Sequence, residues 1–430
     1  MRIAFTTLGC KINQYETEAM QRAAAAEGNA IVPFDSEADV YIINTCSVTA
    51  KSDYQCRQTI RAAVRRRSGA KVIVTGCYAE TRPAEISGIP GVAMVLGNQE
   101  KKNIVRYLPA LPRAAAARTA DQGDPAPSRT RTILKIQDGC DSRCSYCIVP
   151  LARGGSRSVP RHEIVRLFDE SISSGCPEVV LSGIHIGRYG SDLDPRGTLT
   201  DLLRELISKR KGTRIRLSSI EPKEISGDMI EMLGEGLCRH LHVPLQSGDD
   251  AILCSMNRDY TSGQYRELIE SIAGAVPEAA LGADVMVGFP GEGESEFQNT
   301  YRLIEELPLT HLHVFSYSPR PGTAASAMKG QVTDGIKKAR SEALRALGLK
   351  KNMKFRSRFR DRTLRVVLEG GARAEDGGYS GLTDNYLRVR VSGAEKEHIG
   401  KEVPVLIKDV DRFEIIGEIS TNHMKSLRLA

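Results

Sequence analysis

Several features that define common protein classes are missing from this sequence of 430 residues. No run of about 18 apolar residues occurs, which argues against a membrane-spanning helix. The N-terminal stretch MRIAFTTLGCKINQYETEAM soon turns polar and lacks the long apolar segment of a signal peptide. We therefore expect a soluble, cytoplasmic protein with no membrane partner.

Motifs for nucleotide binding and for hydrolysis are missing as well. The sequence has neither a phosphate-binding GxxxxGK[ST] nor a dinucleotide-binding GxGxxG, and it shows no Ser-His-Asp or paired-carboxylate constellation. Tryptophan is absent, but 41% hydrophobic and 26% charged residues are ordinary for a globular protein. The length fits about two to four domains.

Ten cysteines are present despite the missing secretion signal, which favours metal binding or catalysis over a disulfide framework. Cys10, Cys46 and Cys77 end the apolar runs RIAFTTLGC, DVYIINTC and KVIVTGC, and VAMVLGN predicts a fourth strand. Runs that alternate with helical stretches predict βαβ units and an open parallel sheet, whose carboxyl ends share one crevice. The three thiols should therefore meet there, and three separate buried thiols are the alternative.

A second set, Cys140, Cys144 and Cys147, has the spacing CxxxCxxC in DGCDSRCSYCIVP. A structural zinc site needs four ligands, whereas a 4Fe-4S cluster can be held by three thiolates, which leaves one iron open. An open iron suits S-adenosylmethionine (SAM), a cofactor that binds iron to receive an electron. The motif directly follows TILKIQ, the first of six strand-like runs between residues 131 and 330 that predict a partial barrel of parallel strands. The others are EVVLSGI, RIRLSSI, HLHVPLQ, GADVMVGF and HLHVFSYS.

The C-terminal third has a different pattern. Short β-branched strands with glycine between them, at residues 362–425, predict a small closed barrel of the oligonucleotide-binding type. Before them, the segment from Lys337 to Arg365 contains twelve Lys or Arg residues and only two acidic residues, and the whole chain has a net charge of +7. Phe355 and Phe359 interrupt this basic run, as contacts with bases and phosphates would require. A solvated helix followed by a structural barrel is the alternative.

The motif CxxxCxxC, with Tyr146 before its last cysteine, closely resembles that of the radical SAM enzymes. The motifs LGCKINQYETE, NTCSVTAKSDYQCRQ and VTGCYAE, and the small C-terminal barrel, resemble the methylthiotransferases of that group over essentially the whole chain. LGCKINQYETE, KIQDGCDSRCSYCIVPLARG, LSGIHIGRYG and HVFSYSPRPGT look most like the branch that acts on tRNA bearing N6-threonylcarbamoyladenosine.

This resemblance implies an α/β multidomain fold and two 4Fe-4S clusters. Residues 1–108 would form an N-terminal domain whose Cys10, Cys46 and Cys77 bind an auxiliary cluster that carries sulfur. After a linker at residues 109–130, a radical SAM domain would span residues 131–361, and a TRAM-like RNA-binding barrel residues 362–425. All six cysteines would be both metal ligands and catalytic residues.

In the implied reaction, a methylthio group is added at carbon 2 of the modified adenosine next to the anticodon. One SAM molecule would methylate the sulfur on the auxiliary cluster. Another would be cleaved at the cluster of Cys140, Cys144 and Cys147, which gives a 5'-deoxyadenosyl radical that abstracts the adenine hydrogen. An electron donor and a sulfur source, neither identified by the sequence, would be needed as partners.

The SAM pocket should lie where polar residues follow the strands of the central segment, because active sites lie at the carboxyl ends of barrel strands. Tyr146 should lie near the cofactor adenine. The other candidates are Gly183, Ser219, Glu221, Gln246 and Gly288. A turn at either glycine, or a structural salt bridge at Glu221, is the alternative interpretation.

Other substrates and another function class remain open. Isopentenyladenosine in tRNA and a ribosomal-protein aspartate are the substrates of sister branches, and the basic charge favours tRNA. A nucleic-acid-binding protein with structural iron–sulfur clusters is the alternative from another class. The two HLHV runs place histidine pairs on common strand faces, which we interpret as hydrogen-bonded rather than metal-bound; they are His240 with His242 and His311 with His313. We expect ordinary thiols at Cys56, Cys176, Cys238 and Cys254.

Overall fold

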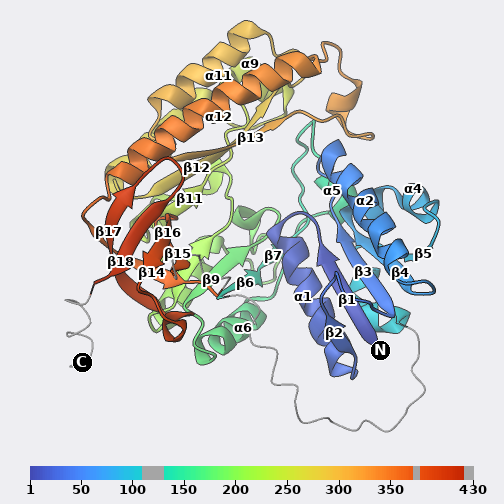
Figure 1. The fold of residues 1–430 in the computed structure, drawn as a ribbon. Coiled ribbons are helices and arrows are strands. Elements are labelled where there is room, and N and C mark those ends of the chain that lie inside the picture. Colours follow the sequence, from blue (N-terminus) through green and yellow to red (C-terminus); the bar gives the residue numbers. More distant parts are fainter. Residues whose placement is uncertain (109–129, 371–377, 421–430) are drawn as a thin grey trace. The chain divides into compact units, whose positions relative to one another are not determined.

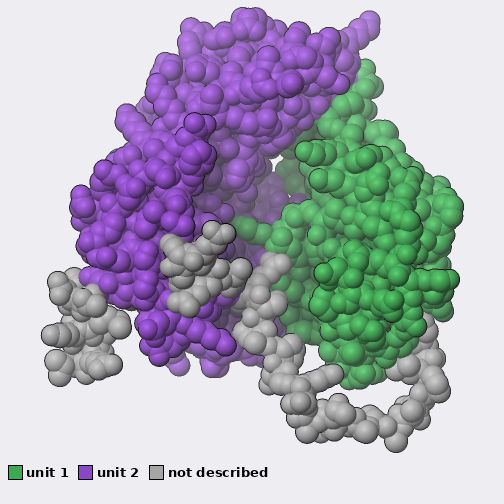
Figure 2. Space-filling model, viewed as in Figure 1, with its two compact units in different colours: residues 1–126, 138–157, 318–327 green, residues 127–137, 158–317, 328–430 purple. Residues whose placement is uncertain are grey.

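The structure is a computed structural model that describes residues 1–108, 130–370 and 378–420 (Figure 1). The chain divides into two compact units, which Figure 2 shows in different colours. Unit 1 combines residues 1–126 with residues 138–157 and 318–327, and unit 2 contains residues 127–137, 158–317 and 328–430. The CxxxCxxC segment therefore groups with the N-terminal part of the chain. Apart from Thr130, the expected linker lies outside the described residues.

A five-stranded parallel sheet forms the centre of unit 1, in the order β2-β1-β3-β4-β5 (Figure 1). The sequence predicted four of these strands and missed the short β2. The strands are β1 (Arg2–Thr7), β2 (Ala30–Val32), β3 (Val40–Thr45), β4 (Lys71–Gly76) and β5 (Val92–Val95). β1, β3 and β4, the strands that precede the three N-terminal cysteines, are direct neighbours.

Helices cover both faces of this sheet because its central strands are apolar on both sides. β3 is buried at every position, which is typical of a strand in a parallel sheet. Tyr41 and Ile43 pack with Ile60 of α2 on one face, while Ile42 packs with Met20 of α1 on the other. The helical segments of unit 1 are α1 (Lys11–Ala26), α2 (Ala50–Arg66), α3 (Cys77–Thr81), α4 (Pro83–Ser87), η1 (Glu100–Tyr107), α5 (Val149–Arg153) and η4 (Ala324–Ala327).

Unit 2 contains all six strands that the sequence predicted for the central segment. They form two parallel three-stranded sheets, ordered β6-β9-β10 and β11-β12-β13. A parallel bridge between Ile215 in β10 and Leu237 continues the strand order, which is that of a partial (β/α)6 barrel. The strands are β6 (Arg131–Lys135), β9 (Glu178–Ser182), β10 (Arg214–Leu217), β11 (His240–His242), β12 (Ala280–Val287) and β13 (His311–Ser316). The short β7 (Gln137–Asp138) and β8 (Arg157–Ser158) form a separate two-stranded sheet.

Amphipathic helices pack on the outer face of these strands. Leu202 and Leu206 of α7, for example, share a core with Leu181 and Leu217 of the sheet. The helices are α6 (Arg161–Ser173), α7 (Leu199–Lys209), α8 (Gly227–Glu231), α9 (Asp250–Ser255), α10 (Ser262–Ala275), α11 (Glu294–Glu306) and α12 (Asp334–Ser357), with short 3-10 turns η2 (Ile186–Arg188) and η3 (Pro222–Glu224). A further 3-10 turn, η5 (Lys396–His398), lies among the C-terminal strands. No helix within the described ranges is long and apolar enough to cross a membrane.

A closed five-stranded barrel ends the described chain, as the sequence predicted, with the order β14-β15-β16-β18-β17 (Figure 1). The strands are β14 (Thr363–Leu368), β15 (Tyr379–Thr383), β16 (Arg388–Ser392), β17 (Glu402–Val410) and β18 (Ile415–Ile419). The expectation for the preceding basic run was wrong in one respect. Phe355 is 5% exposed, Phe359 is fully buried, and both pack into the barrel core. They are unavailable for stacking on bases because the barrel uses them as apolar packing.

Candidate functional site

Cys10, Cys46 and Cys77, called here the strand-end cysteines, follow the carboxyl ends of three adjacent parallel strands. Cys10 is the residue before α1, Cys46 directly follows β3, and Cys77 directly follows β4 and begins α3. Cys46 and Cys77 are buried, whereas Cys10 is exposed. The strand-end positions that the sequence predicted are therefore present on neighbouring strands.

Gly9 lets the chain before Cys10 approach Cys46 closely. Its φ angle is +101°, and a Cβ atom there would lie 2.7 Å from Cys46 Cβ and 2.9 Å from Cys46 Sγ. Only glycine avoids both the clash and the strain of this backbone conformation. The glycine before Cys10 in LGC is thus a local sequence signal that the chain passes close to Cys46 at this point.

The strand-end thiols influence one another electrostatically. Burial raises the pKa of Cys46 to about 11, and Cys77 and Cys10 nearby add to this rise. Burial also raises the pKa of Cys77, while the positive charges of Arg153 and Lys101 oppose that rise. Because a metal needs the thiolate form, the two cations favour the form of Cys77 that binds iron.

The loop cysteines, Cys140, Cys144 and Cys147, lie between β7 and α5 in unit 1 and are half-buried. The backbone N–H of Cys140 donates to the Gly154 carbonyl at 3.0 Å, and that of Cys147 donates to the Cys144 carbonyl at 3.1 Å. The N–H of Ser142 approaches Cys140 Sγ at 3.4 Å. Backbone contacts therefore hold this short loop. None of the ten cysteines, all of which lie within the described residues, forms a disulfide bond.

A buried charged group supports both sets of cysteines in unit 1. The Arg153 guanidinium donates to Asn13 Oδ1 at 2.6 Å, to Glu16 Oε1 at 3.0 Å and to Asp138 Oδ1 at 2.9 Å. The Lys101 ammonium lies 2.5 Å from Glu16 Oε2. Sequence reasoning missed this group. Arg153 lies in the motif PLARG, but its partners on α1 cannot be found from local spacing.

Arg320, in the motif SPRPGT, makes a second buried connection to the strand-end region. It is 3% exposed, donates to Ser47 Oγ at 3.2 Å and forms an ion pair with Asp53. Ser47 directly follows Cys46. The backbone N–H of Ala325 also donates to the Ser145 carbonyl at 2.7 Å. Residues 318–327 thus contact both cysteine regions of unit 1, which sequence reasoning also missed.

The candidates for SAM contact in unit 2 all follow the ends of strands β9 to β12. Glu221 is ion-paired with Arg258, as the structural alternative proposed. Gln246 is buried, and its side-chain Oε1 has no hydrogen-bond partner within the described residues. An orphaned buried amide oxygen is expected where a ligand binds. The remaining ones are Gly183 after β9, Ser219 after β10 and Gly288 after β12, while Tyr146 lies in the cysteine loop of unit 1.

The histidine pairs of β11 and β13 gather around an aspartate of β12. His242 Nε2 lies 3.0 Å and His313 Nδ1 lies 3.3 Å from the same Asp284 oxygen. Although burial alone raises the pKa of a carboxyl, these two hydrogen bonds hold that of Asp284 well below its usual range. Burial lowers the pKa of His311 to about 3. His240 stacks on Tyr386, with ring centroids 4.1 Å apart.

The remaining cysteines do not join either set. Burial raises the pKa of Cys56 to about 12, and its thiol donates to the Cys46 carbonyl at 3.3 Å. Cys238 is also buried, with its pKa raised to about 12 by burial. The Cys176 thiol donates a hydrogen bond to Thr132 Oγ1 at 3.3 Å. Thiol hydrogen bonds of this kind are typical of packed side chains. Cys254 is exposed on α9.

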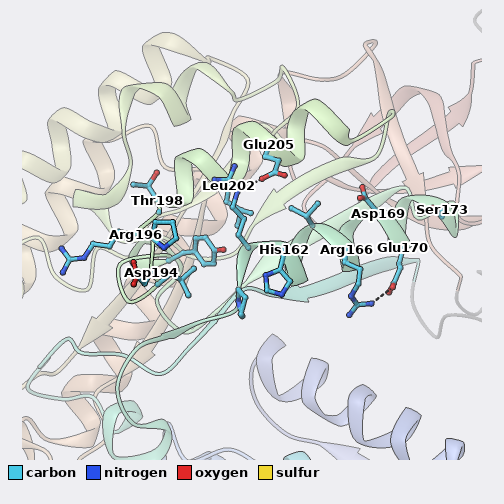
Figure 3. Close-up of a pocket in the computed structure, with 17 residues that line it drawn as sticks. His162, Arg166, Asp169, Glu170, Ser173, Asp194, Arg196, Thr198, Leu202 and Glu205 are labelled. Carbon is cyan, nitrogen blue, oxygen red and sulfur yellow. Dashed lines mark hydrogen bonds and ion pairs between the residues drawn. The ribbon is translucent and has the colours of Figure 1, made fainter.

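A separate cavity of about 1140 Å³ lies between α6, α7 and residues 189–198 of unit 2 (Figure 3). Charges of both signs line it, and two of them, Arg166 and Glu170, pair at 2.5 Å. No cysteine and none of the strand-end SAM candidates lines this cavity. It has no evident part in the chemistry of the cysteines, and the sequence did not predict it.

Two known families match successive parts of the chain. Residues 2–97 match the family described as "Uncharacterized protein family UPF0004", and residues 134–304 match the "Radical SAM superfamily". The first match contains the strand-end cysteines and the second contains the loop cysteines.

Similarity to characterised proteins extends over almost the whole chain. It is 40% identical to the threonylcarbamoyladenosine tRNA methylthiotransferase MtaB of Bacillus subtilis strain 168, over 94% of this chain and 93% of that protein. It is 36% identical to the protein of the same name from Aquifex aeolicus strain VF5, over 95% of this chain and 100% of that protein.

Among solved structures, the chain resembles the radical S-adenosylmethionine methyltransferase TsrM from Kitasatospora setae, with cobalamin and a 4Fe-4S cluster bound. The TM-score is 0.55 at 14% identity, over 76% of this chain and 77% of that chain. At this identity the likeness supports the fold alone. The radical SAM family match and the near full-length relatives show that the chain belongs to the radical SAM methylthiotransferase family, in its MtaB branch.

Proposed function

We propose that the strand-end cysteines and the loop cysteines each hold one 4Fe-4S cluster, with separate roles in one reaction. That reaction is the methylthiolation of threonylcarbamoyladenosine in tRNA by radical SAM chemistry. The cofactors are two 4Fe-4S clusters and SAM. The observation that carries the proposal is the placement of a cysteine directly after each of the neighbouring strands β3 and β4, with Cys10 shortly after their neighbour β1.

The residues present fit these clusters. Each set offers three cysteine thiols outside any disulfide bond, the donors that iron–sulfur clusters take, and three thiolates leave one of four irons open. The strand-end thiols lie near enough for their charges to interact. The loop cysteines sit on a short segment with backbone hydrogen bonds at Cys140 and Cys147. These backbone bonds help to fix the conformation of the loop that carries the three thiols.

When bound, the clusters and SAM supply one-electron cleavage of SAM and sulfur for transfer. The chain contributes burial, charge and position. Arg153 and Lys101 place positive charge beside Cys77 and favour its thiolate. Burial of Cys46 and Cys77 excludes water from two of the three strand-end sulfurs. Arg320 fixes Ser47, the residue after Cys46, through a buried hydrogen bond.

For SAM itself, we assign contacts to Tyr146 in the cysteine loop and to residues at the carboxyl ends of β9 to β12. The unpartnered Gln246 oxygen supports this assignment most directly. Glu221, which pairs with Arg258, has weaker support. Gly183, Ser219 and Gly288 are supported by their position after the strands.

We divide the chain into an auxiliary-cluster domain at residues 1–108, a radical SAM domain at residues 131–361 and a TRAM-like RNA-binding barrel at residues 362–425. The two family matches fall inside the first two ranges, and the closed barrel falls inside the third. We assign tRNA as the substrate at carbon 2 of the modified adenosine next to the anticodon. The reaction requires an electron donor and a sulfur source from outside the chain, and we place it in the cytoplasm.

Anaerobic reconstitution tests the cluster assignment. About eight irons per chain are expected, four for each cluster, together with reductive release of 5'-deoxyadenosine from SAM. The Cys10→Ala variant should retain about half of the iron and still release 5'-deoxyadenosine, but form no methylthio product. Cys144→Ala is the matched variant of the other set and should abolish the release. SAM that stays intact in the reduced wild-type enzyme would support the alternative of structural clusters in a nucleic-acid-binding protein.

The substrate is tested by mass spectrometry of tRNA nucleosides from cells that lack the protein. Loss of methylthio-threonylcarbamoyladenosine, with restoration by the wild-type gene but not by the Cys144→Ala gene, is expected. Loss of a methylthio-isopentenyl nucleoside instead would assign the chain to a sister activity. If all tRNA nucleosides are unchanged, a ribosomal-protein substrate becomes the better hypothesis.

A further inference from the structure

Three side chains that the proposed reaction does not use meet on β11, β12 and β13. His242 Nε2 and His313 Nδ1 lie 3.0 Å and 3.3 Å from Asp284 Oδ1. All three potential ligand atoms lie within 4.8 Å of one another. One residue comes from each of three neighbouring strands, so the tertiary fold creates the group. The sequence suggested pairs within each HLHV run and gave no reason to include Asp284.

Strand register places the three side chains together. His242 is opposite Gly282 in the β11–β12 pair, and Asp284 is opposite His313 in the β12–β13 pair. Gly282 and Asp284 share one face of β12 because side chains alternate along a strand. The other face packs into the apolar core through Leu241, Leu281, Ala283 and Val285. The polar group therefore lies on the face opposite the helices.

Gly282 provides the space that the imidazole rings need. A Cβ atom at this position would lie 2.0 Å from His311 Nε2 and 2.8 Å from His242 Nδ1. The rings thus extend across β12, where any other residue would place a side chain. As a result, the His242 ring reaches Asp284, two residues further along the neighbouring strand.

We propose that His242, Asp284 and His313 bind one divalent transition-metal ion, for which zinc is the best match. Two imidazole nitrogens and a carboxylate oxygen are ligands of three-residue zinc sites that keep the fourth position open. Ligands about 2.0 to 2.1 Å from a tetrahedral ion lie about 3.3 Å apart. The nitrogen–oxygen separations of 3.0 and 3.3 Å are close to this value. No cysteine takes part, so the site is independent of the proposed cluster chemistry.

The group also has an accessible side. The His313 side chain is 63% exposed and that of Asp284 is 27% exposed, whereas His242 is almost buried at 8%. An ion can enter from the His313 side and keep water as its fourth ligand. In the hydrogen-bonded state, each histidine carries a proton on the nitrogen that faces Asp284. Metal binding requires the other tautomer of both rings.

A bound ion would connect β13, the last strand of the sheet β11-β12-β13, to β11. Because the ion binds the folded state and not the separated strands, it should raise the thermal unfolding midpoint. This readout does not depend on catalysis. It also distinguishes a specific site from loose binding at the protein surface, since loose binding does not require the three strands to be in place.

The test uses full-length enzyme with both clusters reconstituted, so that the six cysteines of the two sets are occupied. The protein is titrated anaerobically with Co²⁺, whose visible absorption reports a tetrahedral site, and zinc is counted by mass spectrometry after dialysis. Asp284→Asn keeps the size of the side chain, and His313→Gln alters an exposed residue. His398→Gln is the control, because its ring pairs weakly with Glu397 at 3.8 Å in another part of the chain.

The wild type and His398→Gln should bind one equivalent of metal, with a rise in the unfolding midpoint. Asp284→Asn and His313→Gln should lose about tenfold or more in affinity and show no metal-dependent rise. Unfolding midpoints without metal show whether each variant is folded. The proposal is overturned if the wild type binds no metal beyond its iron, or if both folded variants bind as well as the wild type.

Discussion

The Arg153 guanidinium and the Glu16 carboxylate form a buried ion pair at 3.0 Å, although 137 positions separate them in the sequence. Arg153 is also bonded to Asn13 and Asp138, and Lys101 approaches Glu16 from η1. Glu16 lies on α1, which begins directly after Cys10, while Asp138 and Arg153 flank the loop cysteines. One charged group thus supports both cysteine sets, and disturbing it should affect both.

The first prediction concerns this charged group. Arg153→Met should lower the free energy of unfolding by about 3 kcal/mol, the low end of the cost of breaking a buried ion pair, because Asp138 loses its nearest cation while Glu16 keeps Lys101. Urea unfolding of the cluster-free protein measures the loss. Arg157→Met is the control, since that side chain is 43% exposed and should cost less than about 1 kcal/mol. Equal losses of unfolding free energy in the two variants would show that the buried ion pair contributes no more to stability than an exposed one.

The second prediction concerns Gly9. Gly9→Ala should displace Cys46, because the added Cβ atom would meet its Cβ at 2.7 Å and its Sγ at 2.9 Å. We expect reconstituted enzyme with about half the wild-type iron that still releases 5'-deoxyadenosine. Gly28→Ala is a matched control, since Gly28 has φ +79° but no atom within 4 Å of the added group. It should cost about 1 to 2 kcal/mol of stability and retain full iron. Full iron in Gly9→Ala would exclude a steric role for this glycine.

Much of the fold was predictable because its signals are local. The alternation of apolar runs and helices predicted the parallel sheet, and the placement of Cys10, Cys46 and Cys77 after such runs predicted their positions at strand ends. The partners of Arg153 were not predictable. Its contacts to α1 depend on the packing of segments far apart in the sequence, and no periodicity encodes that packing.

The wrong expectation for Phe355 and Phe359 has a related cause. In the sequence they interrupt a basic run, which fits equally well a surface that binds bases and a helix with one apolar face. In the structure both rings pack into the barrel core, and Arg358 and Arg362 lie over them at 5.7 and 5.4 Å. Which face of α12 is buried depends on the barrel, which comes later in the chain.

The third prediction concerns pH and the buried Glu178. Burial alone would raise its pKa, but Arg216 and Arg214 lower it from 4.5 to about 2. A carboxyl with a depressed pKa stabilises the fold above its unfolded pKa, and this contribution is lost as the pH falls from about 4.5 towards 2. The loss should total about 3 kcal/mol. About 2 kcal/mol of this is lost between pH 7 and pH 3, and urea unfolding at these two pH values measures that part.

The matched variants for this prediction are Glu178→Gln and Glu170→Gln. The stability gap between wild type and Glu178→Gln should be large at pH 7 and shrink at pH 3, because at pH 3 the unfolded wild type binds a proton that the folded Glu178 does not bind. Glu170 pairs with Arg166 on the exposed face of α6, with 58% of its side chain accessible. Its variant should differ from wild type by less than about 1 kcal/mol at both pH values. A gap for Glu178→Gln that does not change with pH would contradict the depressed pKa.

The fourth prediction concerns Phe413, in the turn between β17 and β18 of the C-terminal barrel. Its ring is 82% exposed, and the Arg412 guanidinium lies 5.2 Å from its centre. Stacking of a base on an aromatic ring contributes about 1 to 3 kcal/mol, so Phe413→Ala should weaken tRNA binding about tenfold. The unfolding midpoint should not change, because the ring packs against little of the protein. Leu349→Ala, at a residue 42% exposed on α12, is the control and should leave the tRNA affinity unchanged. Equal tRNA affinities for wild type and Phe413→Ala would contradict a base contact at this turn of the barrel.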